Sequence, residues 1–137
     1  MDRGNELLLE IRVLCREPFR VSGKTTEIVM IPFTGTASGD LFTGKTVGTG
    51  VDTQKIGKNG SFLLSARYML EGTDAVGNAC RIFIENQGNE DTGFIPHVVT
   101  DSPLLQAWET ADLYSTLEGA PGGVTVRIFK KQETAVR

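Results

Sequence analysis

The stretch SFLLSARYMLEG, residues 61–72, alternates its side chains with a period of two. Successive side chains of a β-strand point to opposite faces, so this pattern predicts a half-buried strand. The preceding Asn59-Gly60 predicts a hairpin, because both central residues of a type I′ turn need positive φ. The inward face of the strand would carry Phe62, Leu64, Ala66, Tyr68 and Leu70.

Similar alternation precedes this strand. The segment TTEIVMIPF, residues 25–33, predicts a strand that closes at Pro32, a residue tolerated near strand ends. The segment LLLEIRVLC, residues 7–15, predicts a strand of the same kind. Its inward face would hold Leu7, Leu9, Ile11, Val13 and Cys15.

The second half of the chain continues the pattern. The tail, residues 113–131, predicts a hairpin around its Ala-Pro-Gly-Gly turn. The one helix expected is DSPLLQAWET, residues 101–110, with Asp101 or Ser102 as cap and Pro103 in the first position. The segment NACRIFIENQG predicts a strand whose inward side chains are Cys80, Ile82, Ile84 and Asn86.

Eight or more short strands with turn signals roughly every ten residues favour an all-β fold, either a barrel or a sandwich. We expect a single domain over residues 1–137, built as an antiparallel meandering β-barrel with one short helix. A barrel of about eight strands is either filled by side chains or holds one small ligand.

Charge and composition exclude several partners. A net charge of −3 and a pI near 5.2 argue against nucleic-acid binding, which needs clustered Lys and Arg. No run of apolar residues approaches the length of a membrane span, so we expect no membrane partner. The start of the chain lacks the basic region and cleavage site of a signal peptide. We therefore expect Cys15 and Cys80 to be buried, reduced thiols and the protein to be cytoplasmic.

The segment GDLFTGKT, residues 39–46, matches the phosphate-binding loop of nucleotide hydrolases. That chemistry needs a helix whose N-terminus faces the phosphates, yet VGTGVD follows, with two glycines among β-branched residues. We interpret the match as accidental and the segment as a glycine-punctuated hairpin.

Five polar or aromatic residues are candidates for ligand contact. Tyr68 and Asn86 belong to faces that are otherwise apolar, and a buried polar group needs a partner from protein, water or ligand. A core role for Tyr68 and turn roles for Asn86 and Asp52 are the alternatives. His97 follows a proline in a loop-like segment, and a structural or merely exposed residue is the alternative to ligand contact. Trp108 either packs the helix over a barrel end or forms a ligand lid.

The sequence contains no complete motif for binding a metal or a dinucleotide cofactor. One histidine and two distant cysteines provide no metal-ligand spacing, and GTG at residues 48–50 lacks the third glycine of a dinucleotide fingerprint. We therefore expect neither a metal nor a cofactor.

The order of three segments resembles the domain of unknown function 3237 family, also called uncharacterised protein family 0311. These segments are GTASGDLFTG at 35–44, GVDTQ at 50–54 and NGSFLLSARYMLEGTDAVG at 59–77. The resemblance covers residues 6–130 and also fits Thr100 and Trp108. It implies a lipocalin-like antiparallel barrel, often found as an oligomer, and implies no activity.

Three functions stay open at this point. The first is a barrel that binds a small, mostly apolar molecule in its interior. The second is a cofactor-independent isomerase, cyclase or lyase, with Tyr68 or Asp52 as proton carrier and Asn86 or His97 as orienting partner. The third is a non-catalytic structural homo-oligomer whose barrel is packed solid.

Overall fold

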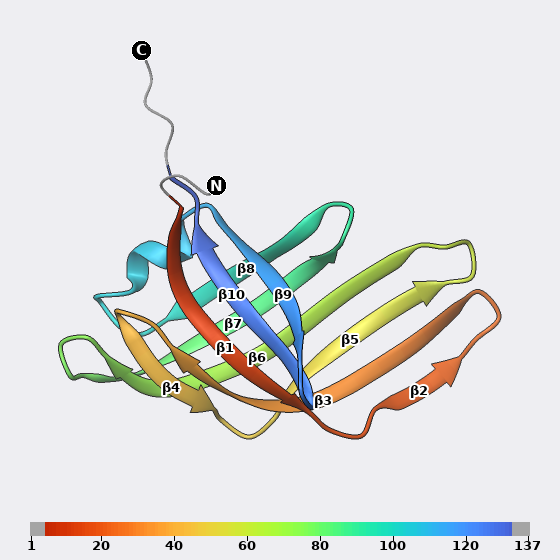
Figure 1. Cartoon of the computed structure of the whole chain (residues 1–137), viewed down its shortest axis with the longest axis horizontal. Helices are drawn as coiled ribbons and strands as arrows, with labels where there is room; N and C mark the ends of the chain where they lie inside the picture. The colour runs from red at the N-terminus through yellow and green to blue at the C-terminus, as the bar shows by residue number, and fades with distance from the viewer. Residues whose placement is uncertain (1–4, 133–137) are drawn as a thin grey trace, which may run out of the picture.

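Ten strands and one 3₁₀ helix follow one another along residues 5–132, the part of the chain that the computed structural model describes (Figure 1). In chain order they are β1 (Glu6–Cys15), β2 (Phe19–Ser22), β3 (Thr26–Ser38), β4 (Phe42–Thr46), β5 (Gly50–Gly57), β6 (Phe62–Asp74), β7 (Ala79–Asn89), β8 (Gly93–Thr100), η1 (Gln106–Glu109), β9 (Leu113–Ala120) and β10 (Gly123–Lys130).

The strands close into an antiparallel barrel, which confirms the predicted fold class. Strand β1 pairs with β10 on one side and with β3 on the other, so the sheet returns to its starting strand. The ten strands fill eight positions, because β1 and β2 lie end to end along one side of β3, and β4 and β5 along the other. Closure pairs β1 with β10, two strands whose edges an open sheet would leave exposed.

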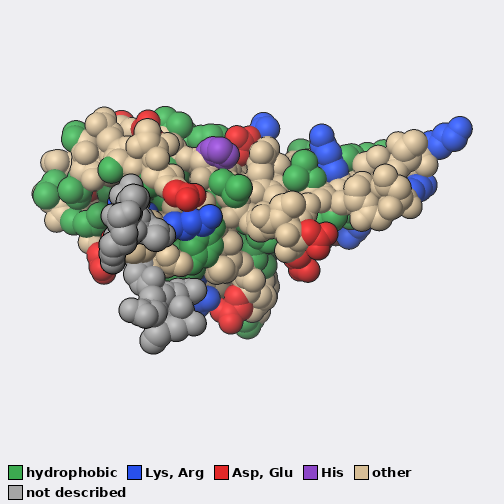
Figure 2. All heavy atoms as spheres, turned by 90° about the horizontal axis from the view of Figure 1, so that it is seen from above, with side chains coloured by type: hydrophobic (Ala, Val, Ile, Leu, Met, Phe, Trp, Pro, Cys, Tyr) green, Lys and Arg blue, Asp and Glu red, His purple; other side chains and the backbone are tan. Residues whose placement is uncertain are grey.

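Part of the sheet projects beyond the barrel as an arm. The arm consists of β2 with residues 26–31 of β3, 53–57 of β5 and 62–65 of β6, which pair side by side. Figure 1 shows these hairpins extending away from η1, and Figure 2 shows them as the tapering end of the molecule. One end of the barrel thus continues into the arm, and η1 lies near the opposite end.

The core lies inside the barrel and follows the predicted alternation along β6 and β7. The inward side chains Leu64, Tyr68 and Leu70 are buried on β6, while Arg67 on the outer face forms an ion pair with Glu85, at 2.7 Å between Nε and Oε2. On β7 the buried residues are Cys80, Ile82, Ile84 and Asn86, as the sequence predicts.

Strand β1 departs from the predicted alternation at its start. Its register against β10 shifts between Leu7 and Leu9, which marks a β-bulge. The bulge buries both Leu8 and Leu9 and leaves Leu7 on the outside with 44% of its surface exposed. The prediction that Leu7 faces inward is therefore wrong, because one extra residue reverses the faces upstream of it.

Strand β3 continues past Pro32 to Ser38, so the predicted end at the proline is also wrong. Pro32 lies where β3 changes its partner from β2 to β1: Met30 pairs with Phe19, and Phe33 pairs with Cys15. The Pro32 carbonyl accepts a hydrogen bond from the Arg16 N–H at 2.8 Å. The missing proline N–H falls at this change of partner, where it interrupts no continuous ladder.

The predicted hairpin between β5 and β6 forms, but its turn differs from type I′. Gly60 has φ of 94°, whereas Asn59 does not have positive φ. The Gly60 N–H donates to the Gly57 carbonyl, and the Asn59 side chain accepts from the Ser61 N–H and hydroxyl. A three-residue loop with glycine alone in the left-handed region explains the geometry.

The predicted two-turn helix is a 3₁₀ helix of four residues, Gln106–Glu109, without a side-chain cap. The two expected capping residues have other partners. The Ser102 hydroxyl donates to Asp74 Oδ2 at 2.9 Å, and Asp101 Oδ1 accepts from the Arg81 N–H at 2.8 Å. The segment is therefore held by contacts to β6 and β7 rather than by helical capping. Within residues 5–132, no helix is long and apolar enough to cross a membrane.

The phosphate-loop match lies on a strand. Phe42–Thr46 forms β4, and Lys45 pairs with Thr36 of β3 and Glu71 of β6. The next regular element is β5, so no helix N-terminus faces this loop. The structure agrees with the interpretation as a glycine-punctuated hairpin.

Candidate functional site

A cavity of about 240 Å³ lies inside the barrel, near the end that continues into the arm. Its wall is built from β1, β3, β5, β6, β7, β9 and β10, and it is mostly apolar, as expected for a small-molecule site. The residues that line it are Val13, Cys15, Ile31, Phe33, Asp52, Gln54, Leu64, Ala66, Tyr68, Asn86, Leu117, Val124 and Val126.

Gly50 makes room for the two aromatic rings of this wall. Gly50 pairs with Phe33, and a Cβ atom on Gly50 would lie 2.6 Å from Phe33 Cζ and 2.7 Å from Tyr68 Cβ. The rings of Phe33 and Tyr68 therefore meet over the glycine, edge to face, with centroids 5.4 Å apart. The glycine gives Tyr68 its place in the cavity wall.

Two oxygens of this cavity lack hydrogen-bond partners. Within the described part of the chain, the buried side-chain atoms without a partner are Asp52 Oδ1 and the Tyr68 hydroxyl. Tyr68 is only 6% exposed, and an unpartnered buried hydroxyl costs about 1–3 kcal/mol. The other carboxyl oxygen, Asp52 Oδ2, accepts from Gln54 Nε2 at 3.0 Å. The site thus combines an apolar wall with two unused polar atoms.

The two residues are close on the sheet. Asp52 pairs directly with Ala66, and Tyr68 lies two residues farther along the same face of β6. Such diagonal neighbours on adjacent strands are about 7–8 Å apart between Cα atoms, within reach of one small ligand group.

Burial also determines the ionisation of the site. Burial raises the pKa of Asp52 above its usual value, although the hydrogen bond from Gln54 opposes the shift. Burial raises the pKa of Tyr68 as well, so its hydroxyl keeps its proton and remains a hydrogen-bond donor. The pKa of Cys15 is raised by burial and by the nearby charge of Asp52. Cys15 is accordingly a neutral thiol rather than a reactive thiolate.

Of the five predicted site residues, three line the cavity: Asp52, Tyr68 and Asn86. The Asn86 amide is partly satisfied by protein, because its Oδ1 accepts from the buried Ser115 hydroxyl at 3.0 Å. This bond connects β7 to β9 and supports the wall beside the cavity.

The other two predicted residues lie elsewhere. His97 is exposed on β8, where the buried neighbours Pro96 and Val98 show that its side chain occupies the outer face. Trp108 is buried on η1 in the main core, outside the cavity lining. Neither side chain joins the cavity wall.

Two lining residues were not singled out from the sequence. Gln54 follows Asp52 by two positions, and this spacing alone puts both side chains on one face of a strand. Cys15 ends the predicted inward face of β1, so its position in the wall follows from the same alternation. The prediction that Cys15 is buried is wrong, because it lies at the end of β1 and is exposed, whereas Cys80 is buried.

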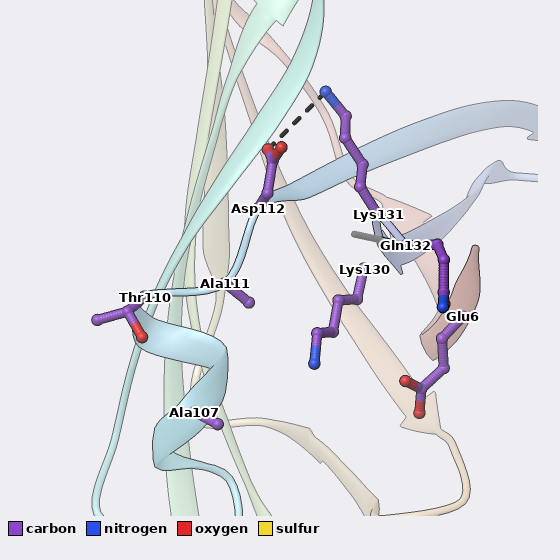
Figure 3. Close-up of a pocket in the computed structure, with 8 residues that line it drawn as sticks. All are labelled: Glu6, Ala107, Thr110, Ala111, Asp112, Lys130, Lys131 and Gln132. Atoms are coloured by element: carbon purple, nitrogen blue, oxygen red, sulfur yellow. Dashed lines mark ion pairs between the residues drawn. The ribbon is translucent and has the colours of Figure 1, made fainter. Parts of the chain in front are cut away.

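A second, more polar pocket of about 510 Å³ lies between β1, η1 and the end of β10, and is lined in part by Lys130, Gln132 and Glu6 (Figure 3). The Lys131 amine points at Asp112, 3.8 Å from its Oδ1, and both side chains are largely exposed. Exposed ion pairs of this kind contribute little energy. No unpartnered buried side-chain atom of the described chain lies here, so this pocket is a weaker candidate than the barrel cavity.

Across residues 5–132, no group of three or more His, Cys, Asp or Glu side chains is arranged to hold a metal ion. The polar groups in the cavity wall are the Tyr68 hydroxyl, the Asp52 carboxyl, the amides of Gln54 and Asn86 and the Cys15 thiol.

Residues 5–93 match the family model described as "Protein of unknown function (DUF3237)". No curated protein matches the chain at a significant level. Solved structures of similar fold include a protein of unknown function from Clostridium acetobutylicum, with TM-score 0.77 and 23% identity over 92% of this chain and 95% of that one.

Two further structures share the fold at lower identity. An enzyme from Penicillium herquei has TM-score 0.74 and 12% identity, over 92% of each chain. A β-barrel-like protein from Acinetobacter baumannii has TM-score 0.73 and 15% identity, over 92% of this chain and 94% of that one. At these identities the comparison establishes the fold alone.

Proposed function

Because the chain belongs to the DUF3237 family, whose function is unknown, we propose its function from the site itself: it binds a small, mostly apolar molecule in the barrel cavity. The observation that carries the proposal is the pair of unpartnered oxygens, Asp52 Oδ1 and the Tyr68 hydroxyl, in an otherwise apolar wall. Buried polar atoms in native proteins almost always have a partner from protein, water or ligand, so a pair without protein partners in one apolar cavity supports a ligand with a polar group at this place.

The chemistry of the wall defines the ligand class. The protonated Tyr68 hydroxyl donates a hydrogen bond, so the ligand needs an accepting oxygen beside it. A hydroxyl group would also donate to Asp52 Oδ1, and a carbonyl group would accept from Tyr68 alone. The cavity is smaller than the roughly 300–1,000 Å³ of pockets for drug-sized ligands. We therefore propose a compact molecule of one or two rings with one hydroxyl or carbonyl group.

Cofactor-independent catalysis is the second candidate function. It is favoured by the position of Asp52, a carboxyl whose pKa burial raises, beside a hydrogen-bond donor in an apolar cavity. The Penicillium herquei protein of similar fold is itself an enzyme, which is consistent with this candidate.

Binding of α-naphthol, a bicyclic apolar alcohol with intrinsic fluorescence, tests the proposed site. Ala66→Leu fills the cavity opposite Asp52, and Ala79→Leu, the same change at an exposed position of β7 outside the cavity, is the matched control. We expect Ala66→Leu to weaken binding at least about tenfold, equivalent to about 1.4 kcal/mol, and the control to leave it unchanged. Equal affinities for all three proteins would place the ligand outside the cavity and refute the proposal.

We also propose that the protein forms a homo-oligomer through its arm. The outer face of the arm exposes apolar side chains: Phe19 is 66% exposed, Val21 is 62% exposed, and Met30 and Leu63 lie on the same face. Contiguous exposed apolar side chains are typical of protein interaction sites, and a second copy of the chain would cover them. The free thiols of Cys15 and Cys80 support the cytoplasm as the proposed compartment.

A further inference from the structure

Resting on the proposed binding function, we infer that the barrel cavity catalyses proton transfer at the carbon next to a ketone: Asp52 Oδ1 is the base and the Tyr68 hydroxyl holds the ketone oxygen. The substrate class is a compact, mostly apolar ketone with an acidic α-hydrogen. The reaction is an enolisation or a double-bond shift, which needs no metal, redox group or second substrate.

The placement of the two oxygens carries this inference. Abstraction of an α-proton requires a base at the carbon and a hydrogen-bond donor at the carbonyl oxygen, two bonds away. Asp52 and Tyr68 project into the same cavity from diagonal positions on β5 and β6, and each has one oxygen free. A ketone placed between them would present its oxygen to Tyr68 and its α-carbon to Asp52.

The step balances within the site. Asp52 Oδ1 takes the α-proton, the electron pair of the C–H bond forms the carbon–carbon double bond, and the carbonyl π electrons move to oxygen. The Tyr68 hydroxyl keeps its proton and donates a hydrogen bond to the resulting enolate oxygen. The Asp52 carboxyl then returns the proton to the same carbon or to the far end of a conjugated system. No atom or electron is lost.

The surroundings of Asp52 suit a base. The apolar wall strengthens every electrostatic interaction with the enolate, and burial raises the pKa of Asp52 so that the carboxylate binds a proton more readily. Gln54 is a positioning residue, because its hydrogen bond occupies Oδ2 and leaves Oδ1 without a partner. Tyr68 is in turn held by the edge of Phe33 over Gly50.

The test measures hydrogen–deuterium exchange at the α-carbon of β-tetralone, an apolar bicyclic ketone, by proton NMR in deuterated buffer. Its affinity is measured separately by displacement of α-naphthol. The variants are Asp52→Asn and Tyr68→Phe, and the control is Asp112→Asn, whose carboxyl is exposed outside the cavity. Melting curves of each protein confirm folding.

We expect the unmodified protein to accelerate exchange. Asp52→Asn should lower the exchange rate about 100- to 10,000-fold and Tyr68→Phe about 100- to 1,000-fold, with kcat reduced more than KM is raised. The control should match the unmodified protein. Binding of β-tetralone without accelerated exchange would overturn the catalytic inference and leave the binding function intact. No binding of β-tetralone or α-naphthol would overturn both, and exchange that survives Asp52→Asn would overturn the role of Asp52.

The role of Gln54 has its own readout, the pH profile of exchange. The hydrogen bond from Gln54 lowers the pKa of Asp52, so Gln54→Leu should move the rise of the profile to higher pH. The titratable groups facing Asp52 are Cys15 from β1 and Tyr68 from β6. The residues paired directly with Asp52, Ile31 on β3 and Ala66 on β6, have apolar side chains that do not titrate. Cys15 and Tyr68 both remain neutral where Asp52 titrates. An unshifted profile would remove Gln54 from the mechanism.

Discussion

Replacement of Tyr68 by phenylalanine should stabilise the free protein, because the hydroxyl that it removes is buried and has no partner. Leaving such a group unsatisfied costs about 1–3 kcal/mol, and the ring contact with Phe33 survives the substitution. For a chain of 137 residues, 1 kcal/mol corresponds to about 3–5 °C in Tm. We therefore expect Tyr68→Phe to raise Tm by roughly 3–15 °C.

The other tyrosine of the chain provides the matched control. The Tyr114 hydroxyl accepts a hydrogen bond from Asn5 Nδ2 at 3.0 Å, and its ring stacks on Phe129. Tyr114→Phe deletes a bond that is made, and should cost about 0.5–1.5 kcal/mol. The same substitution is therefore expected to raise the free energy of unfolding at Tyr68 and to lower it at Tyr114.

Urea unfolding of both variants, followed by circular dichroism, measures these differences as the free energy of unfolding extrapolated to water. A loss of 1 kcal/mol or more in Tyr68→Phe, as an order-of-magnitude threshold, would show that the hydroxyl has a partner in solution. A partner for this hydroxyl within the protein would contradict the proposal that a ligand satisfies it.

Three further predictions concern the site and the arm. Gly50→Ala should destabilise the fold by about 1–3 kcal/mol, because its Cβ would overlap Phe33 and Tyr68, whereas Gly119→Ala, with open space around it, should be nearly neutral in thermal unfolding. The raised pKa of Asp52 means that its contribution to stability is present below pH 3.8 and is lost as pH rises through the folded-state pKa. Asp52→Asn should therefore gain stability relative to the unmodified protein as pH rises above 3.8, and parallel curves of Tm against pH would contradict this. Val21→Thr combined with Phe19→Ser should shift the native mass toward the monomer, and an unchanged mass would exclude this face as the interface.

The strands and their faces could be predicted where alternation is uninterrupted. On β6 and β7 the buried positions follow directly from the period of two. At the start of β1 three consecutive leucines are equally apolar, so the sequence holds no signal for the bulge that reverses Leu7. The 3₁₀ helix is short for a similar reason: Ser102 bonds to Asp74, a residue 28 positions away that local pattern does not reveal.

The candidate site could be predicted only in part. Alternation puts Tyr68 and Asn86 on inward faces, whereas Asp52 lies in a glycine-rich stretch for which the sequence favours a turn role. Barrel closure brings all three residues to one cavity. His97 lies between inward-facing Pro96 and Val98, so the same rule applied to β8 predicts an outward side chain. The missing partners of two oxygens are a property of three-dimensional packing, and no sequence pattern reports them.

The pairing between β8 and β9, called the seam below, is the weakest in the barrel wall. Within residues 5–132, β8 and β9 share a single register pair, Phe94 with Ser115, although every other neighbouring pair in the barrel forms a longer ladder. The Ser115–Asn86 bond from β9 to β7 is buried beside that seam. Few backbone hydrogen bonds therefore join the facing edges of β8 and β9. Local opening between these two strands consequently needs little energy. We expect the backbone amide hydrogens between β8 and β9 to exchange with solvent sooner than those of the longer β6–β7 ladder.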